Sequence, residues 1–100
     1  KPLFAQKNVK LLSGRLMGRN QNVGKYIIAD ETGHTYEMIY FGDIGKWNEF
    51  LTEKFGQENT DAVYSGRRAN KELCFTIAYY PDLNYFGGRE SVQIVMQHYC

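Results

Sequence analysis

Cationic, amide and aromatic side chains recur along the sequence in a combination that can bind a nucleic-acid strand. Lysine and arginine attract phosphates, and aromatic rings stack on exposed bases. Each stacked base contributes about 1–3 kcal/mol to binding. We therefore expect a binding surface for an unpaired strand. The candidate nucleic-acid-binding residues are Arg19, Asn22, Lys25, Tyr36, Tyr40, Asn84, Tyr85 and Arg89.

The aromatic candidates also have a purely structural interpretation. Tyr36 and Tyr40 alternate with Met38 along one predicted strand, and cross-strand packing would account for both rings. Phe86 could pack into one end of the fold, which makes its neighbour Tyr85 the better candidate for stacking.

The sequence holds no constellation of residues that would make this chain an enzyme by itself. His34 and His98 lie near predicted strand ends, with no partner at metal-ligand spacing. Asp30 and Glu31 fall in a predicted turn, where aspartate is favoured for its local geometry. The pair Gly87-Gly88 does not precede a helix, so it does not indicate a phosphate-binding loop. We predict no catalytic residue, no metal site and no cofactor in this chain.

Charge is segregated along the chain although the net charge is only +1. Residues 1–29 carry six basic and no acidic side chains, whereas residues 30–61 carry eight acidic and two basic ones. Residues 62–100 are nearly neutral, with four basic and three acidic side chains. This segregation favours a basic surface that faces an anionic partner, unless folding mixes the charges again in space.

Length and composition predict one folded domain that spans residues 1–100. The chain does not begin with Met, as expected for a piece of a longer protein. No apolar run approaches the ~18–20 residues that a bilayer requires, so we expect no membrane partner. Cys74 sits in an apolar run and Cys100 is the last residue, a pattern typical of reduced thiols and of a cytoplasmic location.

Hydrophobic periodicity predicts five strands and one helix. Apolar residues recur at helical spacing only between Ile44 and Phe55, where Asp43 can cap the start and Gly56 can end the helix. Gln57–Asp61 is predicted as a polar connection, Ala62–Tyr64 as a short edge strand and Pro81–Gly88 as a loop. The predicted strands are Asn8–Gly18, Lys25–Ala29, His34–Phe41, Glu72–Tyr80 and Glu90–Tyr99.

This order of elements predicts a mainly β fold. A five-stranded barrel with one helix between its third and fourth strands has the topology of the OB-fold. Closure of the barrel would remove most of the exposed strand edges. An open α+β sheet with the helix packed on one face is the alternative, because periodicity alone does not separate the two.

The last two predicted strands contain a distinctive run over residues 78–95. Paired aromatics lead to an Asn-x-aromatic-x-Gly loop, and a Ser-Val-Gln-Ile strand follows. The run resembles the end of the RecJ-type single-stranded-DNA-specific exonucleases. The stretch Ile39-x-Phe41-Gly42 and the opening Lys1-Pro2 with Phe4 are also similar to that family, whereas residues 57–71 depart from it.

The resemblance implies a C-terminal OB-fold domain of a longer multidomain nuclease. In that family, a separate DHH-type core holds manganese or magnesium ions and cuts the DNA. Such a parent protein would be a 5′-to-3′ exonuclease of DNA repair and recombination, and its partners would be single-stranded DNA and the core domains of the same chain. The catalytic chemistry would lie outside the present residues.

A docking module without direct nucleic-acid binding is the second hypothesis, since a fold does not fix its function. In that case Tyr36, Tyr40 and Tyr85 would form an apolar patch against another domain. A basic strip that joins Arg19 and Lys25 to Arg89 would instead favour nucleic acid.

Overall fold

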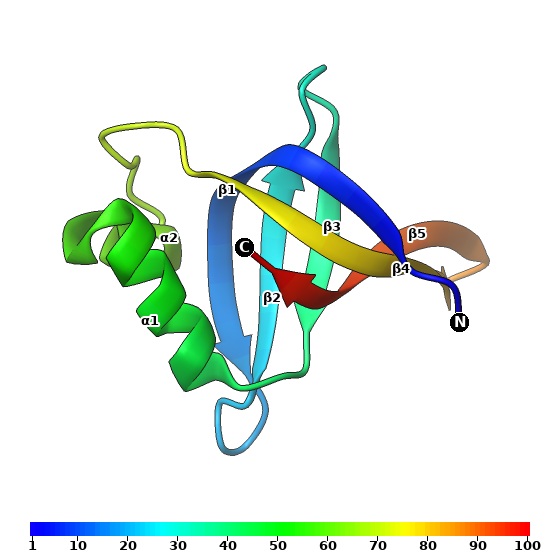
Figure 1. The fold of residues 1–100 in the computed structure, drawn as a ribbon. Helices are drawn as coiled ribbons and strands as arrows, with labels where there is room; N and C mark the ends of the chain where they lie inside the picture. The colour runs from blue at the N-terminus through cyan, green and yellow to red at the C-terminus, as the bar shows by residue number, and fades with distance from the viewer.

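The computed structural model describes residues 1–100, except for the side chain of Phe86. Five strands and two helices follow one another along the chain (Figure 1). They are β1 (Phe4–Met17), β2 (Val23–Ala29), β3 (Thr35–Tyr40), α1 (Ile44–Phe55), α2 (Gln57–Ser65), β4 (Cys74–Phe86) and β5 (Arg89–Tyr99).

The strands form a closed barrel in the order β1-β2-β3-β5-β4, which confirms the predicted OB-type topology. β3 and β5 pair in parallel, and the other neighbours pair antiparallel. β1 is long enough to close the barrel alone: its first part pairs with β4 and its second part with β2. The register of β1 shifts twice, once near Asn8, which has a φ of 57°, and once between Leu11 and Ser13.

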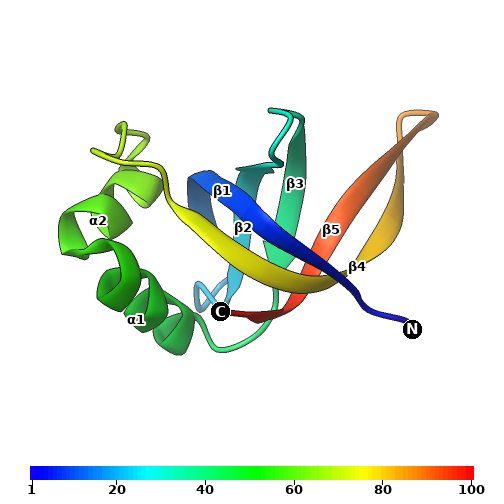
Figure 2. The same cartoon turned by 45° about the horizontal axis from the view of Figure 1, so that its top comes forward.

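α1 has the bounds predicted from its periodicity. The Asp43 side chain caps it by accepting a hydrogen bond from the Lys46 backbone N–H at 3.0 Å. Gly56 ends it with a φ of 94° and donates its N–H to the Thr52 carbonyl at 2.9 Å. Both helices lie together beside the barrel, next to β1 (Figures 1 and 2). Among the described helices, neither is long and apolar enough to cross a membrane.

α2 occupies residues for which we predicted a polar connection and a short edge strand, and that prediction is wrong. Two of its buried residues are polar, so its inner face does not look apolar in the sequence. Asn59 donates to the Phe55 carbonyl and accepts the backbone N–H of Asn70, both near 3 Å. Thr60 donates to the Gly56 carbonyl at 3.1 Å. These bonds satisfy the buried polar atoms, so the face can pack against the barrel.

The predicted loop Pro81–Gly88 is also wrong, because β4 continues to Phe86 and pairs with β5 from Ile77 to its end. Only Gly87 and Gly88 form the turn, with φ values of 60° and 79°. Two successive positive φ angles belong to the tight hairpin turn that glycine favours. Pro81 is tolerated in the strand because β1 reaches only Tyr79, so the other edge of β4 is free there.

The indole of Trp47 is fully buried and fills the end of the barrel nearest the helices. Its ring centroid lies 4.8–6.0 Å from those of four aromatic residues of the barrel. These are Tyr26 on β2, Tyr40 on β3, Phe75 on β4 and Tyr99 on β5. Trp47 therefore joins α1 to four strands of the barrel, and Leu51 and Phe55 of the same helix also belong to the core.

A chain of hydrogen bonds runs from this indole through both helices. Trp47 Nε1 donates to Tyr26 Oη at 2.8 Å, and Tyr64 Oη donates to Asn48 Oδ1 at 2.6 Å. Tyr26 Oη lies 2.7 Å from Tyr64 Oη, whose own proton is already used, so Tyr26 is the donor. Burial raises the pKa of both phenols, which stay neutral well above their ordinary range.

Replacing Tyr26 by Phe removes the centre of this chain and leaves the Trp47 N–H without its acceptor. We expect the free energy of unfolding to fall by about 1–3 kcal/mol, the cost of an unsatisfied buried donor. Urea titration followed by Trp47 fluorescence measures it. Tyr85→Phe is the matched control, since Tyr85 is exposed, and it should change stability by less than about 0.5 kcal/mol. Equal stability of both variants would contradict the role of the chain.

Alkaline pH should weaken the fold through the same tyrosines. The folded state keeps Tyr26 and Tyr64 protonated above about pH 10, whereas the unfolded chain ionises them there. The unfolded state then binds fewer protons, so stability falls as the pH rises above that value, by up to about 1.4 kcal/mol per pH unit for each tyrosine. Urea titrations from about pH 8 to about pH 11.5 cover the range in which free phenols ionise. Over this range, the free energy of unfolding should fall less steeply for Tyr26→Phe than for the original chain. Parallel pH curves would count against this assignment.

Candidate nucleic-acid interface

The side chains of β3 alternate between the inside of the barrel and its outer face. Met38 is fully buried and Tyr40 is only 7% exposed, so the even-numbered side chains point inward. The odd-numbered positions, Thr35, Glu37 and Ile39, are exposed or half-buried and lie on the outside. The outer face is therefore the one that carries Glu37 and Ile39.

Tyr40 was predicted as a stacking platform, and its burial overturns that prediction. Its ring packs against Trp47 at 6.0 Å and edge-on against Tyr99 at 5.9 Å. Gly42 leaves room for this placement, because a Cβ there would clash with Tyr40 Oη. A base could reach this ring only if the ring left the core.

Tyr36 is half-buried at the other end of the barrel interior, where its hydroxyl lies 3.5 Å from Asp30 Oδ2. Asp30 itself holds the β2–β3 turn, as predicted. Hydrogen bonds from Thr32, followed by that from the His34 backbone, lower the pKa of its carboxyl group. Gly33 completes the turn with a φ of 88°.

Basic side chains gather on the outer face where β1 and β2 run together. Arg15 pairs with Lys25 across β1 and β2, and Lys25 pairs with Ile39 across β2 and β3. These residues share one face, and a shallow depression of about 250 Å³ runs between Arg15, Lys25 and Glu37. Lys25 Nζ lies 3.5 Å from Glu37 Oε1, so part of its charge is compensated.

The β1–β2 turn at residues 18–22 brings Arg19 and Asn22 to the same end of the sheet. Both are exposed, and the turn is closed by a hydrogen bond from the Gln21 N–H to the Gly18 carbonyl at 3.1 Å. Gly24, just after the turn, pairs with Tyr40 at the end of β3. The next residue of the chain, Phe41, is 61% exposed and so provides an aromatic ring beside this turn.

We call Arg15, Arg19, Lys25 and Phe41 the cationic end of the outer face. Our sequence-based choice of residues missed Arg15 and Phe41. Arg15 was hidden because charge alone does not show on which face of a strand a residue lies. Phe41 was passed over because the other parity of β3, with three large side chains, looked like the better platform.

The remaining candidates lie on the β4–β5 hairpin, beyond the opposite end of β3. Asn84, Tyr85 and Arg89 are all exposed. Asn84 pairs with Ser91 and Tyr85 pairs with Glu90, so these two neighbours point to opposite faces of the hairpin. Asn84 Nδ2 donates to Gln93 Oε1 at 3.3 Å, and Gln93 is paired with Glu37 of β3. The outer face thus extends from the cationic end to Asn84, while Tyr85 lies on the other side.

The outer face combines basic side chains with an exposed aromatic ring. Three cations and one exposed ring provide the two kinds of contact that unpaired strands use. Among the described residues, no three His, Cys, Asp or Glu side chains come together as they would around a metal ion.

The barrel order, the strand pairing and the helices between β3 and β4 define an OB-type domain. The family model of the RecJ OB domain matches residues 1–98, and the chain belongs to this family. The segment 57–71, which we expected to depart from the family, lies within the matched range. No curated protein and no solved structure shows a significant match.

Proposed function

We propose that this domain binds single-stranded DNA and serves as an accessory module of a 5′-to-3′ single-stranded-DNA-specific exonuclease. The observation that carries the proposal is the cationic end of the outer face in a chain of the RecJ OB family. The parent protein would act in the cytoplasm in DNA repair and recombination.

The strand would lie along the outer face of β3. Arg15 and Arg19 would hold phosphates, and Phe41 would stack on a base. Lys25 would contribute a weaker contact, because Glu37 competes for its charge. A strand of six residues spans roughly 20 Å, so the DNA would pass from the cationic end toward Asn84 and Arg89 on the hairpin. Tyr36, Tyr40 and Tyr85 point elsewhere and are not part of this surface.

The cleavage step would belong to a different part of the parent protein. A DHH-type core with manganese or magnesium ions would cut the phosphodiester bond. The described residues of this chain form no cluster that fits such an ion. The role left to this domain is to grip the unpaired strand and guide it toward that core, which would be its partner in the same chain.

Removing one arginine should weaken binding in proportion to the phosphates lost. Fluorescence anisotropy of a labelled oligothymidylate, titrated at several salt concentrations, gives the affinity and its salt slope. For Arg15→Ala and Arg19→Ala we expect weaker binding at low salt and a salt slope smaller by about 0.7 for each lost contact. Lys71→Ala is the matched control: it removes an equal charge from the loop before β4 and should change neither quantity. Equal effects of all three variants would show that only net charge matters and would contradict the proposed surface.

Phe41→Ala tests the stacking contact separately from the charges. Loss of one stacked base should weaken binding by about 1–3 kcal/mol, which is roughly 5- to 150-fold, without a change in salt slope. Phe41→Trp should retain the affinity. Tyr85→Ala removes an exposed ring from the other face of the hairpin and should leave binding unchanged. If Tyr85→Ala reduced the affinity and Phe41→Ala did not, the DNA would follow a different path.

A further inference from the structure

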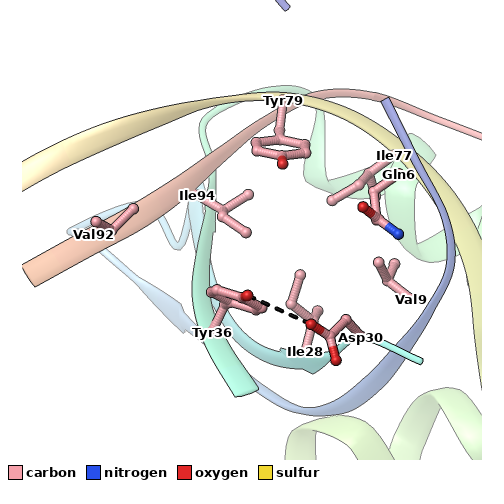
Figure 3. Close-up of a pocket in the computed structure, with 9 residues that line it drawn as sticks. All are labelled: Gln6, Val9, Ile28, Asp30, Tyr36, Ile77, Tyr79, Val92 and Ile94. Atoms are coloured by element: carbon pink, nitrogen blue, oxygen red, sulfur yellow. Dashed lines mark hydrogen bonds between the residues drawn. The ribbon is translucent and has the colours of Figure 1, made fainter. Parts of the chain in front are cut away.

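The end of the barrel interior opposite Trp47 is open. β2, β3 and β4 each direct one aromatic residue toward Trp47 at the end near the helices. Other inward side chains of the same three strands lie at the opposite end of the barrel interior. A pocket of about 120 Å³ lies there. Figure 3 shows Tyr79 on one side and Tyr36 with Asp30 on the side opposite. The deeper walls are Ile28, Ile77 and Ile94.

Exposed apolar side chains lie on the strands that form this pocket. Leu83 and Val92 face each other across the hairpin and are each 53% exposed, and Val92 also lines the pocket. Tyr85 follows on the same face of the hairpin and is 71% exposed. Phe4 pairs with Tyr79, and their rings are 6.0 Å apart. We call Phe4, Leu83, Tyr85 and Val92 the mouth patch. Single exposed apolar residues are ordinary, but a contiguous group beside a pocket marks a binding surface.

Asp30 places at this pocket one carboxylate oxygen that accepts only a long hydrogen bond. Its Oδ1 accepts three hydrogen bonds within the turn, from the backbone N–H groups of Thr32 and His34 and from the Thr32 hydroxyl. Oδ2 has a single long contact, with the Tyr36 hydroxyl at 3.5 Å. The turn therefore fixes the carboxylate while one oxygen remains available to a ligand.

We propose that the barrel mouth binds a peptide segment in which a large apolar side chain stands next to an arginine. The apolar side chain fills the pocket: an apolar cavity of about 150 Å³ is known to hold a benzene molecule. The guanidinium group pairs with Asp30 Oδ2 and packs against the Tyr36 ring, since arginine combines carboxylate pairing with stacking on aromatic rings. The mouth patch covers the residues on either side.

Charge favours a peptide over DNA at this position. Asp30 and Glu31 stand in the β2–β3 turn, and Glu90 lies opposite Tyr85 on the hairpin. Carboxylates at the mouth repel phosphates and attract a basic side chain. The mouth is also distinct from the outer face, so this site is independent of the DNA-binding proposal.

The test uses ¹⁵N-labelled protein and three capped tetrapeptides in NMR titrations. The first is Gly-Arg-Leu-Gly, the second replaces arginine by citrulline, which has the same shape without the charge, and the third replaces leucine by alanine. We expect the first peptide to shift the amide signals of Asp30, Tyr36, Tyr79 and Val92, and the other two to bind at least five times more weakly.

Two variants locate the contact on the protein. Asp30→Asn keeps an oxygen for the turn but replaces the free one by an amide, so it should remove the preference for arginine over citrulline. Val92→Ser should weaken all three peptides, whereas Leu12→Ser, a matched change at a similarly exposed apolar residue elsewhere, should not. Equal binding of the arginine and citrulline peptides would overturn the proposal. So would an absence of shifts at the mouth, or shifts there caused by a guanosine dinucleotide and not by the peptide.

Discussion

The fold depends on one buried contact, the hydrogen bond from the Trp47 indole to the Tyr26 hydroxyl inside the barrel. An indole N–H and a phenol are costly to bury unless each finds a partner. Tyr64 and Asn48 complete the chain, so the barrel and both helices satisfy one another's polar groups. Tyr26 and Tyr40 also need a nearby glycine, because a Cβ at Gly14 would clash with the Tyr26 ring and a Cβ at Gly42 with the Tyr40 hydroxyl.

This contact also decides what the outside of the barrel presents. With Tyr26 pointing inward, its neighbours Lys25 and Ile27 point outward, and the pairing of β2 with β3 does the same for Glu37 and Ile39. The basic surface is thus a consequence of how the core is filled. The other end of the interior receives no residue from the helices and remains open as the mouth pocket. One barrel therefore carries two surfaces of different character, a cationic outer face and an apolar mouth with a carboxylate.

The sequence predicted those features that local chemistry controls. Both ends of α1 were predicted correctly, because its apolar spacing and its capping residue Asp43 indicate the same helix. α2 was missed because its buried Asn59 is polar and is satisfied only by partners outside the helix, among them Asn70. The local sequence also did not show which side of β3 points into the barrel, because both sides carry large apolar side chains. The inward side is selected only by packing between elements, in which the Tyr40 ring at the end of β3 contacts Trp47 of α1. The candidate cations Arg19 and Lys25 lie in the β1–β2 turn and at the start of β2, and their role in binding stays a prediction.

The most direct test of this account is an NMR map of the amide signals that shift when the labelled domain binds an oligothymidylate. We expect the largest shifts in the β1–β2 turn and along the outer face, at Arg15, Arg19, Lys25 and Phe41. The signals of α2 and of the mouth pocket should stay nearly unchanged. Shifts concentrated at Tyr36, Tyr79 and Val92, with none in the β1–β2 turn, would contradict it.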